Sequence, residues 1–231
     1  MSGLFRNKIL PSLPKKQEPE REVKSEKELP ALPAKDPKIV RYPRCNREMV
    51  ARFERLWSTC DILPSKMGEV NGAVSKIKAN KSKYVEVEEA TKVPWEVIAV
   101  IHKMEGNLDF TTCLHNGEKI INTGRKTTLI PKNRGPFKTW SEAAIDAIHI
   151  EAARPIGWRW DIANTLYYLT SFNGWGYENK GINTPYLWSY TNHYTKGKFV
   201  SDGIYNPNAV SKQCGAVPVL KTLGWEPQEW N

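Results

Sequence analysis

Residues 93–117 are the stretch that decides the fold, and they read VPWEVIAVIHKMEGNLDFTTCLHNG. Pro94 suits the first position of a helix, because its missing N–H would have no intrahelical partner there. Apolar residues then recur at helical spacing and predict an inward-facing stripe: Val97, Val100, Ile101 and Met104. Glu105 falls where this helix should end, and Gly106 should let the chain turn away. The stretch therefore predicts a helix that carries one carboxylate to its C-terminal end.

Glu105 is the candidate catalytic residue of this stretch. It follows Ile101 by one turn and Ile98 by two, so it lies on or beside the apolar stripe. Loss of water disfavours the charged form of a carboxyl and raises its pKa, which suits a group that must protonate a leaving oxygen near neutral pH. The alternative is a glutamate that only ends a helix in solvent. An acidic residue is unfavourable at a helix C-terminus, so its presence there calls for an explanation.

The totals restrict the class of protein. At 231 residues the chain can bury one sizeable core and still carry a tail. A net charge of +9 and a pI near 9.3 favour a polyanionic partner, for which nucleic acid, a membrane surface and the anionic bacterial wall all qualify. No apolar run approaches the roughly 18 residues of a membrane span, and the N-terminus lacks the apolar core of a secretory signal.

The chain divides into an arm and one domain. Residues 1–44 are rich in Pro, Lys and Glu, and they contain two aromatic residues, Phe5 and Tyr42. Such a segment buries too little apolar surface to offset its ordering entropy. We therefore predict an extended or disordered arm over residues 1–44 and a folded domain over residues 45–231.

Helical periodicity dominates the domain. Apolar residues at helical spacing predict helices within residues 45–83, in two parts separated by Pro64, and at 142–153, 160–172 and 211–223. Ser141 is the predicted cap of the helix that begins at Glu142. The polar, glycine-containing stretch between Glu105 and Ser141 predicts a small β-hairpin or an irregular loop. The predicted fold is mainly α, with this hairpin or loop region beside the helix of Glu105.

Residues 167–199 form an aromatic stretch that is punctuated by glycines. Tyr and Trp rings match both the apolar faces and the polar rims of sugars, and asparagines such as Asn173 add amide donors and acceptors. Two alternatives are an aromatic core of a loop-rich lobe and a stacking platform for single-stranded nucleic acid. Only three lysines lie in the stretch, at 180, 196 and 198, which is a thin lining for phosphates.

The cysteines and histidines predict no metal site and no cofactor. Cys45, Cys60, Cys113 and Cys214 form no Cys-x-x-Cys pair, and the four histidines include no His-Glu-x-x-His. We expect reduced, partly buried thiols, with one or two disulfides as the alternative if the protein works outside the cytosol.

Several ordered blocks add a family resemblance. Residues 101–110, IHKMEGNLDF, followed by LHNGE at 114–118, resemble a family of bacterial and phage lysozyme-like proteins that has Ile-His-x-x-Glu-Ser-x-x-x-Phe and His-Asn-Gly-Asp elements. The blocks TTLIP at 127–131 and FKTWSEAAIDA at 137–147 are similar to the middle of that family. Residues 172–177, 181–188 and 194–203 resemble its most distinctive block. The resemblance covers residues 93–223. The family that it points to is related in fold to goose-type lysozymes and lytic transglycosylases.

The resemblance implies cleavage of the β-1,4 bond between N-acetylmuramic acid and N-acetylglucosamine in peptidoglycan, with Glu105 as general acid. It places the following residues at the substrate: His115, Asn116, Thr127, Thr128, Asn173, Tyr177, Tyr186, Trp188 and Tyr194. One departure is Gly106, where the family has Ser. The identity of a second catalytic carboxylate stays open, and the candidates are Asp109, Glu118, Asp161 and Glu178. An inverting hydrolase needs such a base, whereas a transglycosylase does not.

We expect a phage-encoded enzyme, either an endolysin or a virion-associated lysozyme whose arm docks onto a virion structural protein. Peptidoglycan is the expected partner, with no nucleic acid and no membrane span. The expected site of action is the host periplasm or cell wall, with the protein cytoplasmic until it is released or carried in the virion. The alternatives are a non-catalytic wall- or sugar-binding virion protein and a basic nucleic-acid binder.

Overall fold

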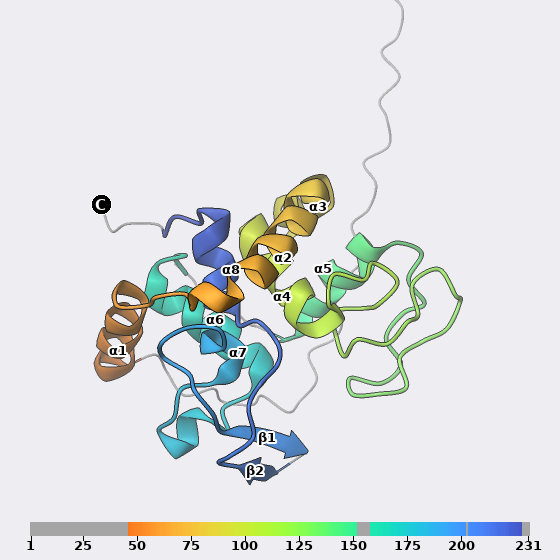
Figure 1. Cartoon of the computed structure of the whole chain (residues 1–231). Coiled ribbons are helices and arrows are strands. Elements are labelled where there is room, and N and C mark those ends of the chain that lie inside the picture. Colours follow the sequence, from red (N-terminus) through yellow and green to blue (C-terminus); the bar gives the residue numbers. More distant parts are fainter. Residues whose placement is uncertain (1–45, 152–157, 202, 228–231) are drawn as a thin grey trace, which may run out of the picture. The chain divides into compact units, whose positions relative to one another are not determined.

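The protein is mainly helical and carries one small antiparallel sheet (Figure 1). The computed structural model describes residues 46–151, 158–201 and 203–227, which fall in the second of two units, Met1–Pro37 and Lys38–Asn231. The predicted arm, residues 1–44, lies outside the described residues. The α-helices are α1 Arg47–Ser58, α2 Met67–Ala79, α3 Lys81–Thr91, α4 Trp95–Gly106, α5 Trp140–Glu151, α6 Ile162–Asn173, α7 Pro185–Trp188 and α8 Ala216–Leu223. The strands are β1 Lys198–Ser201 and β2 Ile204–Asn206, and short 3-10 turns lie at Pro64–Lys66 and Glu178–Lys180.

Helix α4 is the centre of the core. Its residues from Val97 to Met104 are all buried, so the predicted inward stripe extends around the whole helix. Helices α3, α6 and α8 pack against it, while α1 contacts α6 and α2 contacts α8. Burial on every side explains why most residues of this helix are apolar.

The two ends of α4 differ in detail from the prediction. Pro94 is the N-cap with φ −55° and ψ 138°, so the helix begins at Trp95 rather than at the proline. At the other end Gly106 is still helical, and Asn107 makes the left-handed turn with φ 49° while its N–H donates to the carbonyl of His102. Asparagine is the residue that most often replaces glycine in this position.

The caps of the flanking helices follow from short polar side chains. Asn46 accepts from the N–H of Met49 at 2.8 Å and starts α1. Asp161 accepts from the N–H of Asn164 at 2.7 Å and starts α6. Helix α5 uses Thr139, which accepts from the N–H of Glu142 at 3.1 Å, whereas the predicted cap Ser141 donates to Glu86 of α3 at 2.8 Å. The capping prediction was therefore wrong by two residues, because Thr139 with Glu142 forms a capping box.

Helix α3 was not predicted. It buries Tyr84, Val87 and Thr91, but charged residues dominate the rest of its sequence and conceal that face. Its C-cap is Lys92, a non-glycine residue with φ 58°. Its packing on α4 and α5 makes it a wall of the core.

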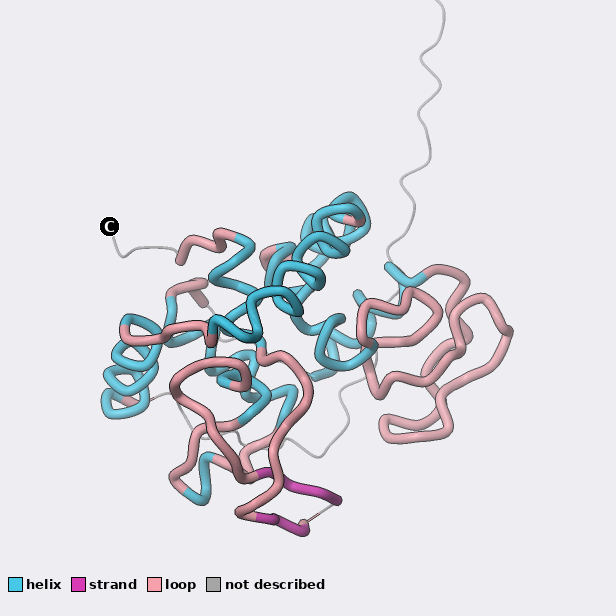
Figure 2. Tube along the Cα trace, in the orientation of Figure 1, coloured by secondary structure: helices cyan, strands magenta, loops and turns pink. Residues whose placement is uncertain are grey.

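The stretch between α4 and α5 is loop, as Figure 2 shows, and the β-hairpin lies elsewhere. Of the two predicted alternatives for this stretch, the irregular loop holds. The antiparallel pair β1–β2 closes later in the chain, with Lys198 opposite Asn206 and Phe199 opposite Tyr205. The loop has no ladder of strand hydrogen bonds, so single backbone bonds, such as that from Thr127 to the carbonyl of Arg134 at 3.0 Å, and side chains hold it together.

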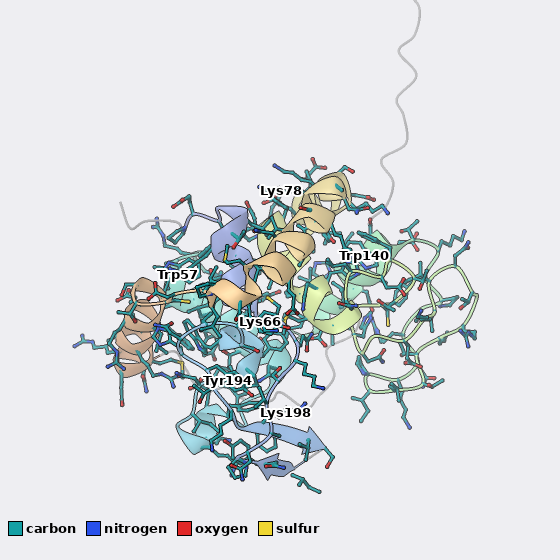
Figure 3. All side chains as sticks on the ribbon, viewed as in Figure 1. Trp57, Lys66, Lys78, Trp140, Tyr194 and Lys198 are labelled. Carbon is teal, nitrogen blue, oxygen red and sulfur yellow. The ribbon has the colours of Figure 1, made fainter. Side chains whose placement is uncertain are left out.

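A buried histidine joins α4 to its surroundings. His102 is fully buried, with Nδ1 3.1 Å from the hydroxyl of Tyr84 and its ring 4.6 Å from both Phe110 and Trp140, the last labelled in Figure 3. Burial is the main cause that lowers the pKa of His102, to about 4. The ring is therefore neutral in the folded protein at neutral pH.

This low pKa makes a prediction for stability against pH. Between pH 6.5 and about 4 the unfolded chain binds a proton at His102 that the folded chain rejects, so stability falls as the pH falls through this window. The loss should reach roughly 3 kcal/mol. We expect His102→Gln to have a flatter profile than wild type over pH 4–6.5 in urea titrations. Identical slopes for the two proteins would show that His102 does not titrate with folding.

Candidate functional site

Glu105 and Tyr186 meet although 81 residues separate them. The Tyr186 hydroxyl donates to Oε1 of Glu105 at 2.9 Å. Tyr186 lies on α7, which Thr184 starts by accepting from the Tyr186 N–H at 3.2 Å. Burial, followed by the charge of Glu105, raises the pKa of Tyr186 well above its ordinary value. The phenol therefore keeps its proton and fixes one oxygen of a half-buried carboxylate.

The turn at Gly117 lies directly against the end of α4. A Cβ at this position would stand 3.0 Å from the carbonyl oxygen of Glu105, and φ is +76°. Both facts require glycine, because an L side chain would be crowded and strained. The close approach brings the segment 114–118, which reads LHNGE, beside Glu105.

A close contact explains why position 106 is a glycine. A Cβ there would stand 2.4 Å from Oγ1 of Thr112 and 3.1 Å from Cδ2 of His102. The Thr112 hydroxyl donates to the carbonyl of Asp109 at 2.7 Å, so it is fixed where the added carbon would go. Thr112 therefore occupies the space that a side chain at position 106 would need.

We expect Gly106→Ala to destabilise the protein by about 1–3 kcal/mol, because overpacking forces a shift at Thr112. In a Thr112→Ala background the same change should cost much less, since the crowding atom is gone and alanine favours a helix. Urea denaturation of the four proteins in this cycle measures the coupling. An equal cost in both backgrounds would show that Thr112 does not set the choice of glycine.

His115 is held in a buried ion pair rather than at a surface. Its Nε2 lies 2.8 Å from Oδ2 of Asp146, and its ring stacks on Phe137 at 5.5 Å. Arg134 also pairs with Asp146, with Nε 2.9 Å from Oδ2. Burial disfavours the charged ring, but the bond to Asp146 and a smaller contribution from Cys113 outweigh it and raise the pKa of His115. This network ties the loop to α5.

Glu118 organises the tip of the loop. Its carboxylate accepts from the N–H and the hydroxyl of Thr128, from the N–H of Leu129 and from the amide of Asn116, at 2.6–3.0 Å. These bonds, led by that from the Thr128 side chain, lower the pKa of Glu118. The structure therefore brings Asn116 and Thr128 together through Glu118, with Thr128 exposed.

Thr127 serves the loop from inside. It is 2% exposed, donates to the carbonyl of Pro131 at 2.6 Å and accepts from the N–H of Arg134 at 2.9 Å. Both partners belong to the same loop, so the Thr127 hydroxyl stabilises the conformation of this loop.

The remaining predicted substrate residues lie in or near the core. Trp188 is 1% exposed, and the rings of Tyr177 and Tyr194 are buried, with hydroxyls that accept from the N–H groups of Phe199 and Ser211 at 2.9 Å. Asn173 donates to Thr184 at 2.8 Å, next to Tyr186. Most of the aromatic stretch therefore builds the lobe that supports Tyr186, which is the core role weighed as an alternative for these rings. A sugar cannot reach Trp188 in this conformation.

Each candidate for a second carboxylate has a structural partner. Asp109 accepts from the N–H and hydroxyl of Thr111 and pairs with Lys119 at 3.0 Å, and these bonds, chiefly from Thr111, lower its pKa to about 2. Asp161 caps α6, Glu118 holds the loop and Glu178 forms an ion pair with Arg52. Among the described residues, no hydrogen bond joins any of these four carboxylates to Glu105.

A cavity of about 690 Å³ adjoins the C-terminal end of α4. Its lining comes from α2, from Lys103 of α4 and the residues after this helix, from Tyr190, from β1 and from residues 211–214. Gln213 connects it to the site, because its amide donates to the carbonyl of Met104 at 2.8 Å. The sequence prediction missed this cavity, although Lys103 within an otherwise apolar helix was a signal for it.

Comparison with known proteins gives no match: no protein-family model, no curated protein and no solved structure matches the chain. Over the described ranges, no helix is long and apolar enough to cross a membrane. Cys60, Cys113 and Cys214 are buried free thiols, and Cys45 lies outside the described residues. Nor does the described part of the chain contain three or more His, Cys, Asp or Glu residues grouped so that they could hold a metal.

Proposed function

We propose that the protein is a peptidoglycan-cleaving glycosidase with Glu105 as its general acid. The observation that carries the proposal is the 2.9 Å hydrogen bond from Tyr186 to Glu105. It joins two of the blocks that carry the resemblance to lysozyme-like proteins, and Gly117 brings a third block against Glu105. A charge of +9 also suits an anionic wall.

In this proposal Glu105 makes one proton transfer. Its carboxyl proton passes to the glycosidic oxygen as the bond to C1 of muramic acid breaks. Tyr186 is a positioning residue, because it acts on the carboxyl rather than on the sugar. Its buried ring holds the hydroxyl that bonds Oε1 of Glu105.

The four other candidate carboxylates, Asp109, Glu118, Asp161 and Glu178, each hold a structural contact. This favours the transglycosylase version of the reaction. There the muramic acid's own 6-hydroxyl attacks C1, the C1–O4 bond breaks, and the hydroxyl proton returns to the Glu105 carboxylate. No water and no second carboxylate is needed, whereas an inverting hydrolase requires a base about 6.5–9.5 Å from the acid.

Digestion of purified peptidoglycan tests the proposal. We expect the wild-type protein to release disaccharide peptides whose masses show 1,6-anhydro-muramyl ends. Reducing muramic ends would replace the transglycosylase version with a hydrolase. Release of no fragments would favour the alternative function, a non-catalytic protein that binds wall or sugar. The phage origin and the docking of the arm on a virion protein stay predictions.

A further inference from the structure

Four lysines line the cavity beside α4: Lys76, Lys103, Lys198 and Lys212. They come from four separate segments, namely α2, α4, β1 and the segment before α8, and Lys198 is labelled in Figure 3. Lys103 is 7% exposed and Lys198 is half-buried, whereas Lys76 and Lys212 are exposed. The charge thus extends from the wall of the cavity to its opening.

The one carboxylate of the lining, Glu69, interacts with the charge of Lys103 and offsets only part of the charge of the four lysines. Glu69 accepts from Lys66 and from the hydroxyl of Tyr190, both at 2.6 Å, and Lys66 is not itself in the lining. In the part of the chain that the structure describes, Lys76, Lys198 and Lys212 form no ion pair with an acidic residue. The cavity is therefore strongly positive.

Of the four lysines, Lys103 gives the strongest indication of a bound anion. Its Nζ donates to the carbonyl of Cys214 at 3.3 Å, a long bond to a neutral acceptor. A buried ammonium is costly unless charged groups compensate it. Burial lowers the pKa of this amine, and the charge of Glu69 opposes that effect only in part. An anion in the cavity would supply that partner.

We propose that this cavity binds a ligand that carries two or more phosphate groups. Its volume lies within the range of about 300–1,000 Å³ that small-molecule sites occupy. Lysine acts as a compact point charge and binds phosphate oxygens well, while planar carboxylates are best matched by arginine, which the lining lacks. Ala73, Leu108 and the ring of Tyr190 add apolar surface for the rest of the ligand. The site does not depend on catalysis at Glu105.

Isothermal titration of the full chain with pyrophosphate, at 150 mM salt and neutral pH, tests this site. We expect a dissociation constant below about 1 mM and at least about a tenfold weakening in Lys103→Met, since its charge is desolvated. Lys198→Met provides an independent variant, with an expected weakening of several fold. Lys78→Met is the matched control, because Lys78 is exposed on α2 and does not line the cavity. Glu105→Gln should bind as wild type does.

The outcomes separate the sources and the alternatives. Tighter binding of a glycerol-phosphate oligomer than of pyrophosphate would identify a phosphodiester polymer as the ligand, and the reverse would identify a free pyrophosphate compound. Malonate that binds as tightly as pyrophosphate would overturn the phosphate assignment. Absence of binding by pyrophosphate, or equal binding by wild type, Lys103→Met and Lys198→Met, would overturn the site itself.

Discussion

Glu105→Gln is expected to lower the rate of peptidoglycan cleavage by about 10²–10⁴-fold, the usual contribution of a positioned general acid. The amide keeps the size of the side chain and can still accept from Tyr186, but it has no acidic proton to give. The fold should persist, because the substitution is nearly isosteric at a half-buried position. Initial rates of release of soluble fragments from purified peptidoglycan measure the effect.

A matched control separates catalysis from a general loss of charge. Glu54→Gln removes one carboxylate from the exposed face of α1 and should leave the rate unchanged. Both variants should unfold at nearly the wild-type denaturant concentration. A Glu105→Gln protein that cleaves at the wild-type rate would remove Glu105 from the mechanism.

Trp188→Ala is expected to destabilise the protein by about 3–5 kcal/mol, the typical cost of deleting a buried Trp side chain. Trp188 is 1% exposed and its ring meets His193 edge-on at 5.4 Å, so the deletion would leave a cavity in the aromatic lobe. That lobe positions Tyr186, two residues earlier on α7. Chemical denaturation followed by circular dichroism measures the loss.

The comparison with an exposed apolar residue gives this prediction its control. Leu129 is 56% exposed at the tip of the loop, and Leu129→Ala should change stability by less than about 0.5 kcal/mol. If Trp188 contacted substrate instead, Trp188→Ala would weaken substrate binding and spare stability. Retention of wild-type stability by Trp188→Ala would therefore contradict the core role that the structure gives this ring.

Hydrophobic periodicity was enough to predict most of the helices. Val70, Val74 and Ile77 marked α2, and the apolar run before Glu105 marked α4. The same rule failed at α3, because the polar Thr91 belongs to its buried face while the apolar Val85 is only half-buried. Periodicity detects a face only when the residues between are clearly different in polarity from that face.

The candidate site was harder to predict from the sequence than the helices. The place of Glu105 at the end of an apolar helix could be predicted, but its bond to Tyr186 depends on a contact over 81 residues. His115 and Thr127 are polar residues near Glu105 in sequence, yet His115 bonds Asp146 of α5 and Thr127 bonds Pro131 within the loop. Polarity alone does not tell a residue that holds a loop from one that faces a ligand, because both need hydrogen-bond partners.

The most direct test of the central claim is mass analysis of the fragments that wild type and Glu105→Gln release from the same peptidoglycan. We predict disaccharide peptides from the wild-type protein and essentially none from Glu105→Gln over the same time. The same fragments in equal amounts from both proteins would contradict the assignment of Glu105 as the acid. Their absence from both digests would contradict the enzymatic function.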